Sequence, residues 1–313
     1  MRIYYAGDIH GSERCWRKFL AAAAFYEADV LVLGGDLTGK ALVPIVEVQP
    51  GRWQAHVLGR DEKIKNEAQL AEVYKRVRFN GFYPYQCSPA EYHRLEADPG
   101  FRDEVISAVI NRELKRWMEI ADEKLAETRV RCLVMPGNDD DFEIDPVIDS
   151  ARRVENPDGK VVALDGYQML SSAWANPTPW DSPRELPEQQ LEEKLEQIAG
   201  ALRPDVPAIF NLHCPPYDSG LDMAPQLTDD LRVVRKGGEQ VLIPVGSQAV
   251  RSVIERHQPL LGLHGHIHES RSAATIGRTL CVNPGSLYAE GVIDGVLVDL
   301  DGDQVTRHQF VQG

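Results

Sequence analysis

Cysteine is scarce in this 313-residue sequence, and no two cysteines are spaced as a CxxC pair. The 5 cysteines are scattered and odd in number, which argues against a disulfide framework and favours a reducing compartment. The sequence also lacks the ~20-residue apolar run that a membrane span needs, and its first residues resemble a strand rather than a signal peptide. We therefore expect a cytoplasmic protein with no membrane-spanning segment.

Positive charge is also in short supply. Lysine and arginine number 34 against 48 aspartates and glutamates, which gives a net charge of −14, and no basic stretch is present. Such a chain repels the phosphates of nucleic acids, so we do not expect nucleic acid as a partner. A small phosphorylated substrate remains compatible with this charge, because a bound cation can reverse the field at one site.

Short apolar runs separated by helical patterns account for most of the sequence. The length and a hydrophobic content of 43 % are compatible with one large core, and we predict a single domain over residues 1–313. Buried strands joined by helices predict a mainly parallel sheet covered on its faces. The end of the chain, residues 271–311, instead predicts strands linked by hairpins. The runs that predict buried strands are "RIYYA", "DVLVLGGD", "VRCLVMPGND", "AIFNLHCPP", "LLGLHGHIH" and "TLCVNPGS".

Residues 41–129 interrupt this alternation, and we interpret them as an insertion. The segments "ALVPIVEV" and "RWQAHVL" predict a hairpin around "QPGR". Two helices are expected at about 61–79 and 101–127, separated by the aromatic segment "FNGFYPYQ". The insertion is either a structural cover or a lid over the active site.

Ligand-type side chains stand at the ends of five of the apolar runs. Strand ends in a parallel sheet share one edge, so we expect these side chains to converge. Each motif alone is more often structural, because a DxH or GGD is usually a turn and a lone histidine on an apolar strand is usually a core residue. Five such segments in order argue against a purely structural explanation. The side chains are those of Asp8, His10, Asp36, Asn138, His213, His266 and His268.

The chemistry of these seven side chains narrows the choice of metal. Carboxylates, an amide oxygen and imidazoles, without a thiolate, suit Mn²⁺, Fe, Zn²⁺ or Co²⁺. Seven ligands are too many for one tetrahedral ion and suit two ions that share a bridging carboxylate. Two ions ~3.5–4 Å apart can generate hydroxide from a bridging water and clamp the oxygens of an in-line displacement at phosphorus. The set therefore predicts phosphoester hydrolysis without a covalent intermediate.

The order of these motifs resembles that of the calcineurin-like metallophosphoesterases. It appears here as "GDIHG", "GGD", "PGND", "NLH" and "HGHIHES", and residues 246–286 are most similar to Icc-related predicted phosphoesterases. The resemblance implies an α/β fold of the α+β kind, a four-layer αββα sandwich of two mixed sheets, with two divalent metal ions, for which we favour manganese. By the same resemblance, Asp8, His10 and His268 would hold the first ion. Asp36 would bridge, and Asn138, His213 and His266 would complete the second site.

Two further residues are candidates for catalysis, Asp139 and His264. Many family members have a histidine after the asparagine, near the leaving group, where this chain has Asp139. An imidazole can donate a proton near neutral pH, whereas an ordinary carboxylate is ionised and only accepts. We therefore expect esters with good leaving groups, such as aryl phosphates or some phosphodiesters, or else a role for Asp139 in orienting the nucleophile or His264. His264 itself precedes the family motif and is expected to orient a ligand or the substrate.

Several other polar residues are expected to be structural or solvent-exposed rather than catalytic or metal-binding. Asp140, Asp141 and Glu269 are interpreted as solvated or helix-capping residues. A phosphate could be contacted by the side chains of Lys40, Ser247 and Arg251, but an exposed surface position is the simpler interpretation for each.

A small-molecule phosphomonoester or phosphodiester is therefore the expected substrate. A nuclease of the same superfamily is the second hypothesis, against which the net charge of −14 counts. A non-catalytic interaction scaffold is the third, and the complete ligand set argues against it. The sequence does not decide the oligomeric state.

Overall fold

A five-stranded sheet forms the first half of the main body in this computed structural model, which describes residues 1–313. Its strand order is β19–β18–β1–β2–β7. The strands β1, β2 and β7 run parallel, and β18 and β19 add an antiparallel hairpin at one side. The strands are β1 (Arg2–Ala6), β2 (Val30–Gly34), β7 (Arg131–Met135), β18 (Asp294–Asp301) and β19 (Gln304–Gln312).

A six-stranded sheet forms the second half, in the order β16–β17–β15–β10–β9–β8. Its four inner strands are parallel to one another. The edge strands β16 and β8 pair antiparallel with their neighbours β17 and β9. The α/β class and the mixed sheets agree with the sequence prediction. The strands are β8 (Val161–Leu164), β9 (Tyr167–Ser172), β10 (Ala208–Leu212), β15 (Leu261–Leu263), β16 (Ser272–Ile276) and β17 (Thr279–Asn283).

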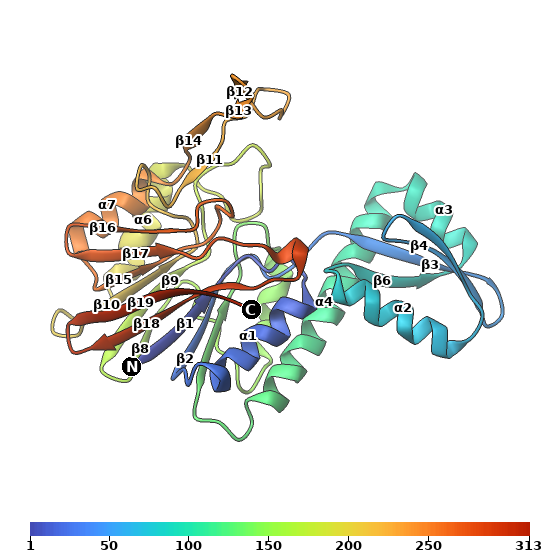
Figure 1. The fold of residues 1–313 in the computed structure, drawn as a ribbon, viewed down its shortest axis with the longest axis horizontal. Helices are drawn as coiled ribbons and strands as arrows, with labels where there is room; N and C mark the ends of the chain where they lie inside the picture. The colour runs from blue at the N-terminus through green and yellow to red at the C-terminus, as the bar shows by residue number, and fades with distance from the viewer.

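Three apolar cores hold the main body together. One contains side chains from both sheets, including Tyr5, Met169 and Leu263. A second joins the five-stranded sheet to helices α1 (Glu13–Phe25), α4 (Pro99–Lys124) and α5 (Asp145–Asp149). The third joins the six-stranded sheet to α6 (Glu188–Ala199) and α7 (Gln248–His257). Helices therefore cover each sheet on the face that is turned away from the other sheet (Figure 1).

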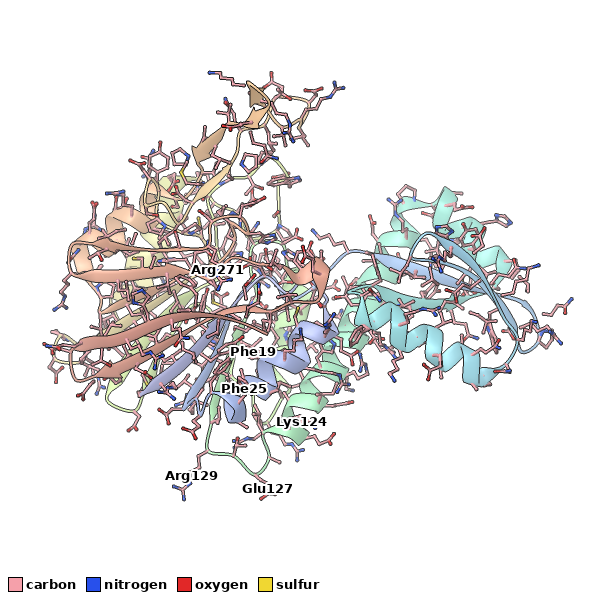
Figure 2. The ribbon with its side chains drawn as sticks, viewed as in Figure 1. Phe19, Phe25, Lys124, Glu127, Arg129 and Arg271 are labelled. Atoms are coloured by element: carbon pink, nitrogen blue, oxygen red, sulfur yellow. The ribbon has the colours of Figure 1, made fainter.

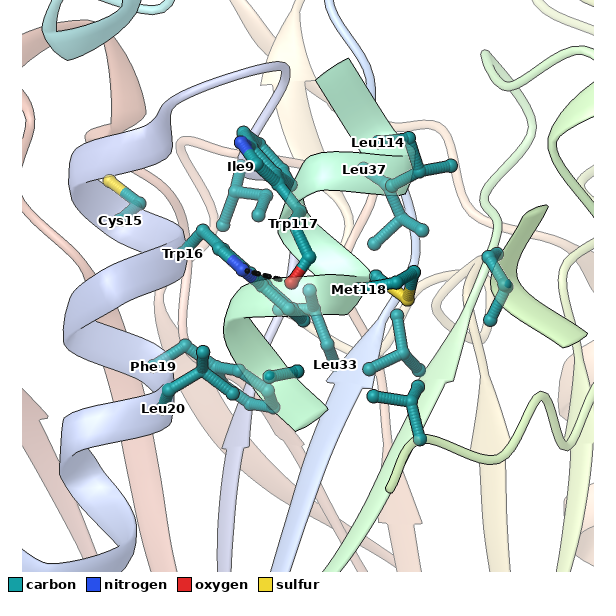
Figure 3. Close-up of a cluster of buried hydrophobic side chains, with 14 of the residues drawn as sticks. Ile9, Cys15, Trp16, Phe19, Leu20, Leu33, Leu37, Leu114, Trp117 and Met118 are labelled. Atoms are coloured by element: carbon teal, nitrogen blue, oxygen red, sulfur yellow. Dashed lines mark hydrogen bonds between the residues drawn. The ribbon is translucent and has the colours of Figure 1, made fainter. Parts of the chain in front are cut away.

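The contact between α1 and α4 is built on two tryptophans. The Trp16 and Trp117 rings stack with centroids 5.5 Å apart, and Trp16 Nε1 donates to the Trp117 carbonyl oxygen at 3.2 Å (Figure 3). Helix α4 ends at Lys124 and leads into a loop, and Figure 2 shows Lys124, Glu127 and Arg129 pointing into solvent.

The chain between β2 and α4 forms a separate lobe that stands away from the main body (Figure 1). Its four-stranded sheet has the order β5–β4–β3–β6, and its own core includes Ile45, Trp53 and Val77. The lobe comprises β3 (Leu42–Gln49), β4 (Arg52–Val57), β5 (Arg60–Ile64), β6 (Tyr83–Cys87), α2 (Glu67–Phe79) and α3 (Pro89–Ala97).

Two details of the lobe differ from the prediction. The helix expected from residue 61 begins only at Glu67, capped by the Asn66 side chain, because residues 60–64 pair with β4 as strand β5. The turn into β5 uses Leu58 and Gly59, both with positive φ, so a hairpin signal was present and was outweighed by the helix-favouring residues that follow. The aromatic segment expected as a separator contributes β6, and α3 follows it.

A second projection extends from the six-stranded half between β10 and α7 (Figure 1). It consists of short antiparallel strand pairs. Outside this projection, the chain has two short 3₁₀ helices, Phe142–Ile144 and Tyr288–Glu290. The pairs are β11 (Met223–Pro225) with β14 (Leu242–Pro244), and β12 (Arg235–Lys236) with β13 (Glu239–Gln240). No helix anywhere in the chain has the length and apolarity required to cross a bilayer.

Candidate metal centre

The seven predicted ligands meet at one place, although 260 positions separate the first from the last. Asp8 and His10 follow β1, Asp36 follows β2, and Asn138 follows β7. From the other sheet, His213 follows β10, and His266 and His268 follow β15. All five strands are parallel members of their sheets, so their carboxyl ends bring these loops together.

The donor atoms fall into two groups that share one residue. Asp8, His10, Asp36 and His268 place donor atoms within 4.8 Å of one another, and Asp36, His213 and His266 form a second such group. Asn138 joins the second group, since its Oδ1 lies 3.0 Å from His213 Nε2. Asp36 belongs to both groups, which is the position that a bridging carboxylate requires.

One buried oxygen of the set lacks a hydrogen-bond partner, and a cation would supply one. Asp8 Oδ2 is buried and accepts no hydrogen bond. The Nε2 atoms of His10 and His268 face each other at 3.2 Å. His213 has its Nδ1 2.8 Å from the Gly34 carbonyl oxygen, which fixes that nitrogen as the donor and leaves Nε2 as a ligand lone pair. Oxygen and imidazole donors in this arrangement fit divalent Mn, Fe, Zn or Co.

The carboxylates and imidazoles of the cluster shift one another's pKa. Burial acts to raise the pKa of the Asp36 carboxyl, but the imidazoles of His213, His10 and His266 outweigh it and hold that pKa below its usual range. Burial acts to lower the pKa of His213, but the charge and hydrogen bond of Asp36 raise it to about 9. A metal ion would therefore compete with a proton for His213 Nε2, so metal binding should release protons.

Backbone strain is concentrated in the same residues. Of the ten non-glycine residues with positive φ, four are members of the ligand set: Asp8, His10, Asp36 and His266. Such conformations cost free energy and persist where the surrounding structure enforces them, commonly at functional sites. Gly137, which precedes Asn138, allows the backbone of this loop to approach Asp36 closely, because a Cβ at residue 137 would lie 2.1 Å from Asp36 Oδ1.

The two acidic residues after Asn138 have different environments. Asp139 lies at the rim, where its backbone amide donates to Asp36 Oδ1 at 3.1 Å and its carboxylate accepts a hydrogen bond from Lys40 Nζ. Asp140 is fully buried, so the prediction that it is a solvated residue is wrong. Its carboxylate accepts from the backbone amides of Leu37, Thr38 and Gly137, each at 2.9 Å. Asp140 thus ties the loop after β2 to the loop after β7.

Arg184 is a buried residue at this site that the sequence analysis did not single out. Its guanidinium donates to the backbone oxygens of Asp140 and Asp141 at 3.0 and 3.1 Å and pairs with Asp145 at 2.7 Å. Its own backbone amide donates to the Asn138 carbonyl oxygen at 3.2 Å. Arg184 therefore fixes the loop that carries Asn138 and Asp139. An arginine in a proline-rich loop 46 positions from Asn138 gives no local signal of this role.

Tyr288 is a second residue that the sequence analysis missed. Its ring centroid lies 4.6 Å from that of His10 and 5.7 Å from that of His268. Burial raises the pKa of the Tyr288 hydroxyl, and the charges of Asp139, Asp36 and Asp8 raise it further. The neutral phenol therefore forms part of the wall around the two histidines.

The remaining polar residues considered from the sequence differ in their burial and contacts. Lys40 is at the rim with Asp139, and Glu269 is exposed. Ser247 is buried and caps α7 through its hydroxyl, which corrects the expectation of a surface role. Arg251 donates to the carbonyl oxygens of Tyr217 and Asp218 and pairs with Glu255.

His264 is completely buried behind the cluster. Its Nδ1 lies 2.9 Å from the Leu212 carbonyl oxygen and 3.2 Å from that of Cys214, the two residues that flank His213. Its Nε2 has no hydrogen-bond partner. The side chain therefore braces the backbone on both sides of His213.

The burial of His264 predicts a dependence of stability on pH. Burial lowers the pKa of its imidazole from 6.5 to about 4, so the unfolded chain binds this proton more readily than the folded chain. The stabilising effect of the neutral ring is complete above pH 6.5 and is lost as the pH falls towards 4. We expect the metal-free wild type to lose about 3 kcal/mol more unfolding free energy over this interval than His264→Gln. Urea unfolding at both pH values measures this difference, and parallel pH profiles would contradict it.

The comparisons with known proteins give a relative and a fold. No protein-family model matches the sequence. The uncharacterized protein MJ1162 of Methanocaldococcus jannaschii is 32 % identical over 167 residues, which cover 52 % of this chain and 68 % of that protein. The crystal structure of TT1561 of Thermus thermophilus shares the fold, with a TM-score of 0.55 and 17 % identity over 100 % of this chain and 97 % of that one. Yfce, a phosphoesterase from E. coli, aligns over 99 % of this chain and 98 % of its own, but its TM-score of 0.33 at 12 % identity is too low to bear on function.

Proposed function

We propose that this chain, which belongs to the same family as the uncharacterized protein MJ1162 of Methanocaldococcus jannaschii, is a metal-dependent phosphoesterase. The observation that carries the proposal is the position of Asp36 in both groups of donor atoms, with ligands from both sheets around it. The motif order supports membership of the calcineurin-like metallophosphoesterases, and the helix-covered sheets support the four-layer αββα arrangement. We regard the kinship with Icc-related members as part of this proposal.

Two divalent ions, with manganese favoured, would polarise the phosphoryl oxygens and lower the pKa of an attacking water. Asp8, His10 and His268 are proposed to hold one ion, and Asn138, His213 and His266 the other, with Asp36 between them. His213 is oriented for this by its bond to Gly34, and His264 braces the residues on either side of it. The burial of Asp8, Asp36 and His213 keeps solvent away from these donor atoms.

The proposed substrate is a small-molecule phosphomonoester or phosphodiester whose leaving group needs little protonation. Asp139 stands where many relatives keep a histidine, and its carboxylate already accepts a bond from Lys40. Aryl phosphates and some phosphodiesters meet this requirement, because their leaving oxygens carry negative charge well. A cytoplasmic location remains part of the proposal.

Residues 41–129, which comprise the lobe and helix α4, are proposed to be an insertion in a single domain, and the lobe is proposed to act as a lid. The support is its attachment: Tyr83 of β6 is buried, and its hydroxyl accepts a bond from the Gly39 amide at 2.9 Å, three residues after Asp36. Loops and lids around a fixed centre commonly carry specificity. A nuclease is the weaker alternative because the net charge of −14 opposes nucleic-acid binding.

Metal analysis followed by a substrate panel tests the proposal. We expect about two transition ions per chain after purification with Mn²⁺, and hydrolysis of aryl phosphomonoesters or phosphodiesters that chelation abolishes and Mn²⁺ restores. Alkyl phosphates with poor leaving groups should turn over more slowly. A chain that binds no metal after supplementation would favour the scaffold hypothesis. Equal kcat for alkyl and aryl esters would contradict the proposal that the enzyme needs a leaving group that requires little protonation.

A further inference from the structure

The loop that follows Asp36 is held at each of the next three residues. The backbone amides at residues 37 and 38 donate to the buried Asp140 carboxylate, and the amide at residue 39 donates to the Tyr83 hydroxyl. The carbonyl oxygen of Leu37 accepts from the Gly11 amide at 2.8 Å. The loop therefore has a fixed path between the metal cluster and the lobe.

Lys40 is the next residue along this loop, and its side chain returns to the metal cluster. Its Nζ donates to Asp139 Oδ1, and the Asp139 amide donates to Asp36 Oδ1 at 3.1 Å. One residue thus separates the ammonium group from the carboxylate shared by the two donor groups. The Lys40 side chain is 54 % exposed and that of Asp139 is 28 % exposed, so a molecule arriving from solvent can reach both.

A stabilising role does not account for this ion pair. Exposed lysine–carboxylate pairs contribute little to stability, and the loop is already fixed by Asp140 and Tyr83. The pair does account for the placement of a positive charge beside the cluster. An ammonium group has three donors, and Asp139 uses one of them. Two donors remain for a negatively charged group.

A phosphoryl group at the cluster would need such a cation. The carboxylates of Asp8, Asp36 and Asp139 make the rim and floor of the site acidic, which repels a phosphate oxygen that no metal ion contacts. Charge-assisted hydrogen bonds to phosphate are among the stronger polar contacts, and lysine is a common phosphate ligand. We infer that Lys40 binds an oxygen of the substrate phosphoryl group and that Asp139 positions its ammonium group. This inference rests on the proposed phosphoesterase function.

Binding of inorganic phosphate to the full-length, Mn²⁺-loaded protein tests the inference, with titration calorimetry as the readout. Lys40→Met should weaken phosphate binding about tenfold with an unchanged manganese content, because it removes a charge-assisted bond to phosphate. Lys40→Arg should restore the affinity to within about threefold, since arginine also donates to phosphate. Lys63→Met, which removes the same charge from the exposed edge strand β5 of the lobe, should bind phosphate as the wild type does.

Three outcomes would overturn the inference. These are equal phosphate affinity in Lys40→Met and the wild type, loss of manganese from Lys40→Met, and a wild type that holds manganese but binds no phosphate. The proposed function fails separately: a wild type that binds manganese and phosphate, with the expected Lys40 dependence, but hydrolyses no phosphoester would contradict the enzyme activity and leave the phosphate site in place.

Discussion

Asp36→Asn is expected to lower phosphoester turnover about a thousand-fold and to remove at least one metal ion per chain. Asp36 is the only residue in both groups of donor atoms, so its carboxylate is the one ligand that two ions would share. An amide has one uncharged oxygen and cannot bridge in the same way. The rate estimate follows from losing about 4 kcal/mol of transition-state stabilisation, at about 1.4 kcal/mol per tenfold change in rate.

A matched control exists for this substitution. Asp181 also has a left-handed backbone, with φ of 51° against 48° for Asp36, but it is exposed in the loop before Arg184. Asp181→Asn removes the same charge from the same backbone conformation, which asparagine tolerates well. We expect its metal content and its kcat/KM to match the wild type. Full metal content in Asp36→Asn, with activity within about threefold of the wild type, would contradict the assignment of the shared ligand.

Asp140→Ala is expected to lower the free energy of unfolding by about 3–5 kcal/mol, the cost typical of breaking a buried charged network. The substitution leaves three backbone amides and the Thr38 hydroxyl without their acceptor. Because these amides belong to the loops that carry Asp36 and Asn138, metal affinity should also fall, by about 10–100-fold. Urea unfolding of the metal-free protein and metal titration measure the two effects separately.

Asp141→Ala is the control for this second experiment. Asp141 is exposed, and its side chain makes no capping bond at the 3₁₀ turn that follows. We expect its unfolding free energy to stay within about 0.5 kcal/mol of the wild type. If Asp140→Ala and Asp141→Ala had equal effects, the hydrogen bonds of Asp140 would not be the cause.

The seven proposed ligands were readable from the sequence for a physical reason. Each follows a short apolar run at its carboxyl end, as in "VLGGD", which ends with Asp36, and "NLH", which ends with His213. A parallel sheet places such ends on one edge, so local patterns alone predicted that distant residues would meet. The same logic predicted the α/β class, because buried strands that alternate with helices have few other ways to pack.

Local patterns were insufficient where a partner from elsewhere in the chain decided the outcome. Asp140 and Asp141 are identical neighbours in the sequence, but only Asp140 is buried, where its carboxylate accepts from amides of the loop after β2 as well as from Gly137. Residues 60–64 favour a helix by composition, and pairing with β4 makes them a strand.

The sequence by itself determined the types and order of the converging polar side chains and the class of fold, because these follow from residue chemistry and from short-range periodicity. Tertiary structure decided which other polar groups hold the loops that carry those side chains. Arg184, Tyr83 and Asp140 act through backbone atoms 43–103 positions away, and a hydrogen bond to backbone leaves no sequence pattern at its acceptor or donor. It also decided that Lys40 faces Asp139 at the rim of the site.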